Sequence, residues 1–433
     1  MTNTDPPALL LTTWSDTEAE MVRQLLEHHG IQCSVSSEVP HAVLPLTVDG
    51  LGEVRVHVPA AALDEARTIV AAYRRSLNPA AGPPTRGVVV PMPVTVKAAT
   101  RIDLAGGTLD IWPLYLYLDN PVTVNLAIDL VATAHVHTTG DTTAVSLESE
   151  DLHRRTRADT PDALEMDGPL ALLARLVRHL RPAGGVSLRT AATVPAGSGL
   201  GGSSALAVAI AVALRRDAGH PPGPDEAGDL ARLLADLEAQ VLGVPTGVQD
   251  YYPALFGGVL ELSFGPGAVR VRRLPIPAAR LAERLVLVYE GASRSSGTFN
   301  LDMVQRFLRG DPTARSALAA VGQAAGELAA ALAAGDLDGA GRAMAKEMEA
   351  RRQLSPDLLT PATERLFDAA AHAGALSAKV CGAGGGGCSV YWAAAGRREP
   401  LARALRQAGG EVLEFHGVEQ GLLAAGALPS DRA

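Results

Sequence analysis

Apolar and polar residues follow two different periodicities along this chain, and each predicts a type of element. Alternation of apolar and polar positions predicts strands, whereas apolar residues at every third or fourth position predict helices. The predicted strands cover residues 94–99, 122–128, 132–138, 185–190, 256–262, 285–289 and 388–392. The predicted helices cover residues 170–180, 205–214 and 229–242 and most of 313–373. No apolar run approaches the roughly 18 residues that a membrane-spanning helix needs, so we expect no membrane segment.

The first 78 residues carry a pattern of their own. Strand-like stretches at 8–13, 31–35 and 54–58 are interleaved with helical stretches at 19–28 and 59–73. This pattern predicts a small α+β accessory domain over residues 1–78, without a catalytic constellation. It resembles a small family of prokaryotic signal-transducing domains. Residues 79–93 are rich in proline and glycine and are predicted to be a linker.

The segment Pro195–Ser204 reads P-A-G-S-G-L-G-G-S-S and lies between a predicted strand and a predicted helix. Its glycines, at positions 197, 199, 201 and 202, permit positive φ and let the backbone approach an anion closely. The free N–H groups of the first helical turn then point at that anion, whose charge the helix dipole favours. Ser203 and Ser204 add hydroxyl groups that suit a phosphate or its metal ion. We therefore predict a phosphate-binding loop, the alternative being a flexible turn that only caps the helix.

Two common phosphate-binding motifs are excluded. The P-loop motif G-x-x-x-x-G-K-[ST] requires a lysine that this segment lacks. The run Gly197–Gly202 matches the dinucleotide motif G-x-G-x-x-G only in form, because no acidic residue closes a βαβ unit about 20 residues later.

Charge and cysteine content narrow the class of protein. The 433 residues carry a formal net charge of −9, whereas nucleic-acid binding requires a basic face, so we expect no nucleic-acid partner. Three cysteines do not make a disulfide framework and fit a reducing compartment. The N-terminus lacks the positive region of a signal peptide. We therefore expect a cytoplasmic protein, whose oligomeric state the sequence leaves open.

Two further glycine segments follow predicted strands. Gly106 and Gly107 separate an apolar stretch from Thr108 and Asp110, which predicts a bend that presents side chains to a pocket. Residues 382–387 include five glycines, and ordering so many glycines is costly in conformational entropy. We predict that their backbone packs against the phosphate-binding loop where no Cβ fits, the alternative being a loose hairpin.

Taken in order, the segments 97–110, 195–204 and 380–389 resemble those of the GHMP kinases, named for galactokinase, homoserine kinase, mevalonate kinase and phosphomevalonate kinase. The resemblance covers about residues 92–425, and the run R-I-D-L-A-G-G-T-L-D is similar to the sugar-kinase branch, including heptose-phosphate kinases. It implies a two-lobed α+β fold with the nucleotide between the lobes. A ribosomal-protein-like N-terminal lobe would occupy 94–270, and a ferredoxin-like C-terminal lobe would occupy 271–433.

The resemblance also implies roles for individual residues. ATP would be held by Pro195, Gly197, Ser198, Gly199, Leu200, Gly201, Gly202, Ser203 and Ser204. Ser203 and Glu238 fall where the family binds Mg²⁺, with Ser204 as the alternative, since Gly202 replaces a serine that is common in the family. Asp250 matches the catalytic base and Arg101 the catalytic cation. Glu238 and Arg101 have ordinary surface positions as their alternatives.

The predicted acceptor side is less specific. Asp110 matches a sugar-hydroxyl ligand, and a carboxylate can accept two hydroxyl hydrogen bonds, although a turn aspartate is the alternative. Thr108, Gly384 and Gly385 complete the predicted acceptor-binding set. Arg294 is predicted to hold a phosphate already present on the acceptor, or else to be an exposed loop residue. Nearby, Trp112, Tyr115 and Tyr117 are interpreted as core residues rather than stacking platforms.

These assignments predict a phosphotransferase that uses ATP and Mg²⁺ on a hydroxyl of a small sugar or sugar phosphate. Two alternatives remain open. One is a mevalonate- or homoserine-type kinase, whose acceptor carries a carboxylate. The other is a nucleotide-binding regulatory module without catalysis, because a fold alone does not establish activity.

Overall fold

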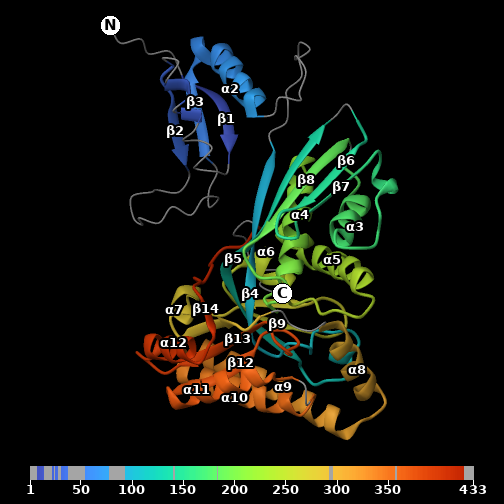
Figure 1. Ribbon diagram of the computed structural model, residues 1–433, viewed down its shortest axis with the longest axis vertical. Coiled ribbons are helices and arrows are strands. Elements are labelled where there is room, and N and C mark those ends of the chain that lie inside the picture. Colours follow the sequence, from blue (N-terminus) through green and yellow to red (C-terminus); the bar gives the residue numbers. More distant parts are fainter. Residues whose placement is uncertain are drawn as a thin grey trace. The chain divides into compact units, whose positions relative to one another are not determined.

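The computed structural model describes residues 7–13, 22–23, 25–27, 31–37, 54–77, 93–139, 142–182, 184–291, 296–355 and 358–423. The chain separates into two units, Met1–Val90 and Pro91–Ala433 (Figure 1). Each unit mixes helices with mainly antiparallel strands, which confirms the α+β class.

The first unit is a three-stranded antiparallel sheet with helix α2 (Leu63–Leu77) after it. The sheet order is β1 (Pro7–Thr13), β3 (Val54–Pro59) and β2 (Ser34–Ser37). Strand β2 begins three residues later than the sequence predicts. The core of the first unit contains the fully buried Leu26, Val56 and Ala66.

The second unit contains a seven-stranded sheet built around one long strand, β5 (Val122–Thr139). Strand β4 (Val94–Ala105) pairs with β5 along one edge. The first part of β5 pairs with β9 on its other edge, and the last part pairs with β8. The remaining order is β9–β10 and β8–β6–β7, with the bounds β6 Val145–Ser149, β7 Arg154–Ala158, β8 Gly185–Ala192, β9 Val259–Ser263 and β10 Arg270–Arg273.

The prediction of two strands at 122–128 and 132–138 was wrong, because β5 runs through the interval without a break. A bulge accounts for the break in the alternating pattern between the two predicted strands. The register shifts between Ala99 and Thr100, which pair with Val131 and Ile128, so two residues of β5 bulge out there. The Thr100 hydroxyl fixes the bulge by donating to the Leu130 carbonyl at 2.6 Å.

Two helices of the second unit, α4 (Gly202–Asp217) and α6 (Tyr251–Phe256), contact the seven-stranded sheet directly (Figure 1). Helices α3 (Ala171–Leu180) and α5 (Ala227–Leu242) pack on α4 and extend the same hydrophobic core. Helix α4 is buried almost completely, as its run of small apolar residues allows. The predicted strand at 256–262 begins only at Val259, because residues 251–256 form α6, and Gly257 ends that helix at a φ of 67°.

A second, four-stranded sheet has the order β12 (Ala375–Val380), β13 (Cys388–Ala393), β11 (Leu285–Tyr289) and β14 (Glu411–Leu413). The accompanying helices are α7 (Ala278–Ala282), α8 (Ser296–Leu308), α9 (Pro312–Ala333), α10 (Leu337–Arg352), α11 (Pro361–His372) and α12 (Arg398–Gln407). Among the described helices, only α9 is long and apolar enough to cross a membrane by length and composition. It packs along α10 and against β5, with Leu318, Val321 and Leu328 fully buried, as in a core helix.

Candidate functional site

The predicted site segments meet in one cleft of about 470 Å³ in the second unit. Its lining includes the phosphate-binding loop, the turn after β4, the segment before α6 and the start of the second glycine loop. The predicted residues among its lining are Arg101, Thr108, Asp110, Pro195, Gly197, Ser198, Gly199, Gly201, Gly202, Ser203, Ser204, Glu238, Asp250 and Gly384. Residues far apart in the sequence therefore share a single hollow.

The phosphate-binding loop connects β8 to α4, as predicted. Gly197, Gly199 and Gly201 have φ values of 71°, 75° and 74°, which a residue with a Cβ rarely adopts. The first helical hydrogen bond runs from the Ala205 N–H to the Gly201 carbonyl at 2.9 Å. No acceptor in the described part of the chain takes the N–H groups of residues 202–204. These three amides and the helix dipole form an anion-binding end.

Two loop residues differ from the prediction. Gly202 does not have positive φ but is the first residue of α4, where an added Cβ would come within 2.8 Å of the Val194 side chain. Leu200 is fully buried and does not line the cleft; its carbonyl accepts the Arg101 N–H at 3.0 Å. Leu200 thus contributes to the loop's anchoring rather than to its open surface.

The second glycine loop packs directly on the first, which confirms the prediction that no Cβ fits there. A Cβ on Gly199 would lie 2.4 Å from the Cys381 carbonyl oxygen, and one on Gly387 would lie 2.7 Å from the Gly197 carbonyl oxygen. Gly384 reaches the cleft. Gly385 is absent from the lining, and its N–H donates to the Leu358 carbonyl at 2.9 Å, so we do not retain it as an acceptor ligand.

Arg101 and Asp250 form a close ion pair at the cleft. Strand β4 alternates polar and apolar side chains here, so that Arg101 shares a face with Asp103 while Ile102 joins the core. The Asp250 Oδ1 atom accepts from Arg101 Nε at 2.9 Å and lies 2.7 Å from Arg101 Nη2. Burial alone would lower the pKa of Arg101, but the neighbouring carboxylates outweigh it and raise that pKa. The arginine is therefore a fixed positive charge beside Asp250.

Glu238 lies on α5 and faces the start of α4. Its Oε1 atom accepts a short hydrogen bond from Ser203, and its Oε2 atom accepts from Ser204 at 2.9 Å. Tyr251, which sequence reasoning missed, also donates a short hydrogen bond to Oε2. Burial raises the pKa of Glu238, and the hydroxyl donors oppose that shift. Ser203 is exposed and Ser204 is buried, so Ser203, which contacts Oε1, is the more accessible of the two serines in the cleft.

This donor set fits Mg²⁺. A hydroxyl and a carboxylate are hard oxygen ligands, and protein Mg²⁺ sites commonly use one or two carboxylates completed by substrate phosphates and water. The described residues contain no group of three or more His, Cys, Asp or Glu side chains that could hold a metal ion by themselves. A nucleotide's phosphates would therefore have to supply part of the coordination.

Asp110 is buried beneath the acceptor side of the cleft. Its Oδ2 atom accepts the Gln249 N–H at 2.9 Å, and its Oδ1 atom accepts the Thr108 N–H at 3.2 Å. Gly247 passes so close that a Cβ there would lie 1.9 Å from Oδ2. Burial raises the pKa of Asp110 to about 6, and the Asp250 carboxylate adds to that rise. The predicted phosphate ligand Arg294 lies outside the described residues.

A cluster of four buried charges, of which Asp103 reaches the cleft, was not predicted. It consists of Asp103 on β4, Glu347 and Arg351 on α10, and Lys379 on β12. Lys379 Nζ lies 3.2 Å from both Asp103 Oδ2 and Glu347 Oε1. A lysine in an otherwise apolar strand before the second glycine loop was the available signal, but its partners lie far away in sequence.

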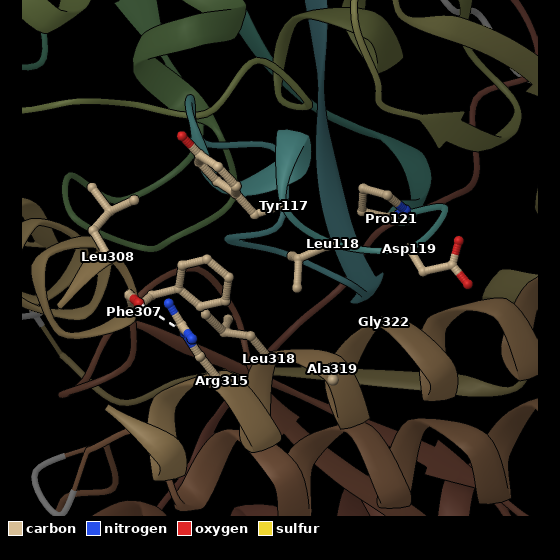
Figure 2. A pocket seen from close by; sticks show the side chains of 10 residues that line it. All are labelled: Tyr117, Leu118, Asp119, Pro121, Phe307, Leu308, Arg315, Leu318, Ala319 and Gly322. Carbon is tan, nitrogen blue, oxygen red and sulfur yellow. Dashed lines mark hydrogen bonds between the residues drawn. The ribbon is translucent and has the colours of Figure 1, made fainter. Parts of the chain in front are cut away.

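A second hollow of about 580 Å³ lies between residues 117–121 and helices α8 and α9 (Figure 2). Arg315 stacks over the Phe307 ring at 5.6 Å and donates from Nε to the Phe307 carbonyl at 3.2 Å. The lining contains none of the predicted phosphate-binding or catalytic residues. We therefore do not assign the reaction to this hollow.

The aromatic residues near this hollow correct another prediction. Trp112 and Tyr117 expose 65% and 64% of their surface, so neither is a core residue. Tyr115 alone packs inward, with its ring 6.1 Å from that of Phe264. Proline residues around this segment (Pro113 and Pro121) interrupt regular structure and leave the two exposed rings on a surface loop.

Comparisons with known families agree with this arrangement. The model of the GHMP kinases N terminal domain matches residues 170–258, and that of the GHMP kinases C terminal domain matches 328–411. Residues 8–74 match a family described as a prokaryotic signal transducing protein. The match at 170–258 includes the phosphate-binding loop, Glu238 and Asp250.

Relatives of known activity extend the match over most of the second unit. A D-glycero-alpha-D-manno-heptose 7-phosphate kinase of Campylobacter jejuni is 29% identical over 343 residues, covering 76% of this chain and 98% of the relative. A mevalonate kinase of Thermococcus onnurineus is 31% identical over 251 residues, covering 57% of this chain and 70% of the relative. The crystal structure of a D-glycero-D-manno-heptose 1-phosphate kinase from Bacteroides thetaiotaomicron superposes with a TM-score of 0.61 at 27% identity, covering 76% of this chain and 97% of that structure.

Proposed function

Because this chain belongs to the GHMP kinases, a family of phosphotransferases that act on hydroxyl groups, we propose that it phosphorylates a sugar or sugar phosphate with ATP and Mg²⁺ in the 470 Å³ cleft. One observation carries the proposal. The free amides at the start of α4, the Ser203–Glu238 pair and the Asp250–Arg101 pair all face the same hollow. Phosphoryl transfer requires these parts together: an anion cradle, a place for the metal and a positioned acceptor.

On the nucleotide side, the amides of residues 202–204 would hold phosphate oxygens. Ser203 and Glu238 Oε1 would hold Mg²⁺, which when bound neutralises charge that develops on the phosphates. Ser204 and Tyr251 keep Glu238 in place through its other oxygen. The carboxylate can thus present Oε1 to the metal without reorganising.

On the acceptor side, Asp250 would orient the attacking hydroxyl and take its proton. Both contacts between Arg101 and Asp250 use Oδ1, and no described residue hydrogen-bonds to Oδ2. Oδ2 can therefore accept the proton of the acceptor hydroxyl as its oxygen attacks the γ-phosphorus. Arg101 meanwhile fixes the orientation of the carboxylate through its two contacts with Oδ1.

The cleft suits a polyol better than a carboxylate-bearing acceptor. Asp110 and Asp250 are both acidic, and a carboxylate accepts hydroxyl hydrogen bonds but repels another carboxylate. Among the described lining residues, Arg101 is the only lysine or arginine, and Asp250 already pairs with it. This favours a sugar over mevalonate or homoserine, although mevalonate kinases are among the relatives.

A panel assay tests the proposal. Purified protein, Mg-ATP and one acceptor at a time would be incubated, with ADP release and a ³¹P spectrum of the product as readouts. The panel contains free hexoses and heptoses, the 1-phosphates of both, heptose 7-phosphates, mevalonate and homoserine. We expect turnover with a sugar or sugar phosphate. Turnover confined to mevalonate or homoserine would refute the choice of acceptor, and tight nucleotide binding with no turnover would favour the regulatory alternative.

The role of Arg294 has its own test within this assay. If Arg294 holds an acceptor phosphate, Arg294→Ala raises KM for phosphorylated sugars and leaves KM for free sugars unchanged. If the KM for phosphorylated sugars is the same in the variant as in the wild type, that role is excluded. The cytoplasmic location and the accessory role of residues 1–78 remain predictions from the sequence.

A further inference from the structure

The buried charge cluster is difficult to explain by stability alone. The side chains of Asp103, Glu347, Arg351 and Lys379 are each at most 3% exposed. Desolvating four charges costs several kcal/mol per ion, and apolar residues of similar volume often serve a core as well or better. Two positive and two negative groups in such a place therefore call for a role beyond packing.

The cluster is connected to the backbone of both loops that shape the cleft. Arg351 Nη2 donates to the Gly382 carbonyl at 2.7 Å, and Nη1 donates more weakly to the Gly107 carbonyl at 3.4 Å. Glu347 Oε1 accepts the Gly106 N–H at 3.2 Å. One guanidinium thus spans the acceptor-side turn and the second glycine loop.

We propose that Arg351 is a positioning residue that sets the separation between the acceptor and the nucleotide. The turn at Gly106–Gly107 leads directly to Thr108 and Asp110, which line the acceptor side. Gly382 packs on Gly199 of the phosphate-binding loop, where its Cβ would lie 3.0 Å from the Gly199 Cα. Arg351 itself does not line the cleft, so it acts through these two loops. The kinetic part of this inference rests on the proposed function.

The remaining three charges have a supporting role in this scheme. Asp103 Oδ2 and Glu347 Oε1 lie 3.8 and 3.7 Å from Arg351 Nη1 and balance its charge. Lys379 contacts the same two carboxylate oxygens and balances the second negative charge. The planar guanidinium fork is needed because it can reach two carbonyls at once, whereas a lysine ammonium offers one point of contact.

The test compares Arg351→Lys with wild type and with the control Arg284→Lys in the full-length protein. Arg284 is also largely buried, donates to the Ala393 carbonyl at 2.9 Å and pairs with Asp338, but neither partner belongs to a loop of the cleft. The readouts are amide hydrogen exchange of segments 103–111 and 381–388, the Kd for a non-hydrolysable ATP analogue, and kcat and KM for the acceptor. If Arg351→Lys fails to fold, the charge-balanced pair Glu347→Gln with Arg351→Met replaces it.

We expect Arg351→Lys to speed exchange in both segments and to lower kcat by about 10- to 100-fold, since a misplacement of about 1 Å can cost that much. The control should change neither quantity. Unchanged exchange in either segment, or unchanged kcat beside a lowered Tm, would overturn the inference and leave the cluster as a core feature. If wild type turns over no acceptor in the panel, the proposed function fails, and the exchange data still decide this inference.

Discussion

Replacing Asp250 with asparagine tests the central pair of the site. Asparagine keeps the size of the side chain and can still accept a hydrogen bond from Arg101, but it cannot take a proton at neutral pH. The exchange therefore removes charge and basicity while largely preserving shape. If Asp250 activates the acceptor hydroxyl, kcat must fall far more than nucleotide affinity.

The structure sets the size of both effects. A positioned general base contributes about 10²- to 10⁴-fold, so kcat should fall within that range. Removing one charge of a buried pair costs about 3–5 kcal/mol when nothing replaces it. Here the Asp250 side chain is 24% exposed, and the amide oxygen still accepts from Arg101, so we expect a loss of about 1–2 kcal/mol. In a unit of this size, that lowers Tm by only a few degrees.

The assay measures kcat, the Kd of a non-hydrolysable ATP analogue and Tm for Asp250→Asn beside Asp129→Asn. Asp129 also contacts a basic side chain, with its Oδ2 atom 2.8 Å from His416 Nδ1, but both partners are exposed. Exposed pairs contribute about 0–1 kcal/mol, so this control should keep kcat and nearly all of its Tm. If Asp250→Asn retains more than about a tenth of wild-type kcat, or loses nucleotide binding in the same proportion, the assignment of the base is wrong.

Three further predictions concern the loop, the acceptor and the metal. Gly199→Val should abolish nucleotide binding measured by calorimetry, because the φ of Gly199 is +75° and a Cβ there would lie 2.4 Å from a carbonyl oxygen. Gly219 has a similar φ of +78° but open space around it, so the control variant Gly219→Val should bind the nucleotide normally. Since the pKa of Asp110 is raised to about 6, kcat/KM for the acceptor should fall as pH drops below about 6. If the pH profile of Asp110→Asn shows the same fall in kcat/KM at low pH, that fall belongs to another group. The same raised pKa means that this carboxyl stabilises the fold most at low pH and loses that contribution as pH rises from its ordinary pKa of 3.8 to about 6. Tyr251→Phe should raise the Mg²⁺ concentration needed for half-maximal rate, because Glu238 loses a donor; an unchanged Mg²⁺ titration would contradict this.

The phosphate-binding loop could be predicted from sequence because its physics is local. Four glycines, three serines and the start of a helix stand within ten residues of one another, and each contributes through its own backbone or hydroxyl group. The contact between the two glycine loops could also be predicted from the sequence, since a run of glycines suits a place where a Cβ would clash. The close approaches at Gly199 and Gly387 bear this out.

Features that depend on distant partners could not be predicted. Arg351 reads as one more charge on an amphipathic helix, and only the fold brings it to Gly107 and Gly382, each by a backbone carbonyl that carries no sequence signal. From the sequence, Tyr251 likewise looks like an apolar residue after Asp250. The partner of its hydroxyl group, Glu238, lies 13 residues earlier on another helix. Long-range pairing, rather than composition, decides such positions.

The continuity of β5 shows that hydrophobic periodicity does not reliably predict where a strand ends. The interval between 128 and 132 lacks clean alternation, which the sequence analysis interpreted as the end of a strand. A bulge produces the same irregularity while both neighbours remain paired. Hydrophobic pattern alone does not separate these cases, because it records which faces are buried and not which residues lie opposite each other.

That bulge has an evolutionary consequence. Side chains of a strand point alternately to its two faces, so losing a single residue from the Asp129–Leu130 step would break the match between the alternation of β5 and that of β4. One of the two strands would then have to turn its side chains to the wrong face or give up its pairing, and Arg101 and Ile102 lie on β4 beside this step. Insertions and deletions should therefore be purged from this inconspicuous spot as strictly as substitutions are purged from the reaction centre itself. Comparing gap frequencies there across many descendants of the same ancestor would reveal such selection.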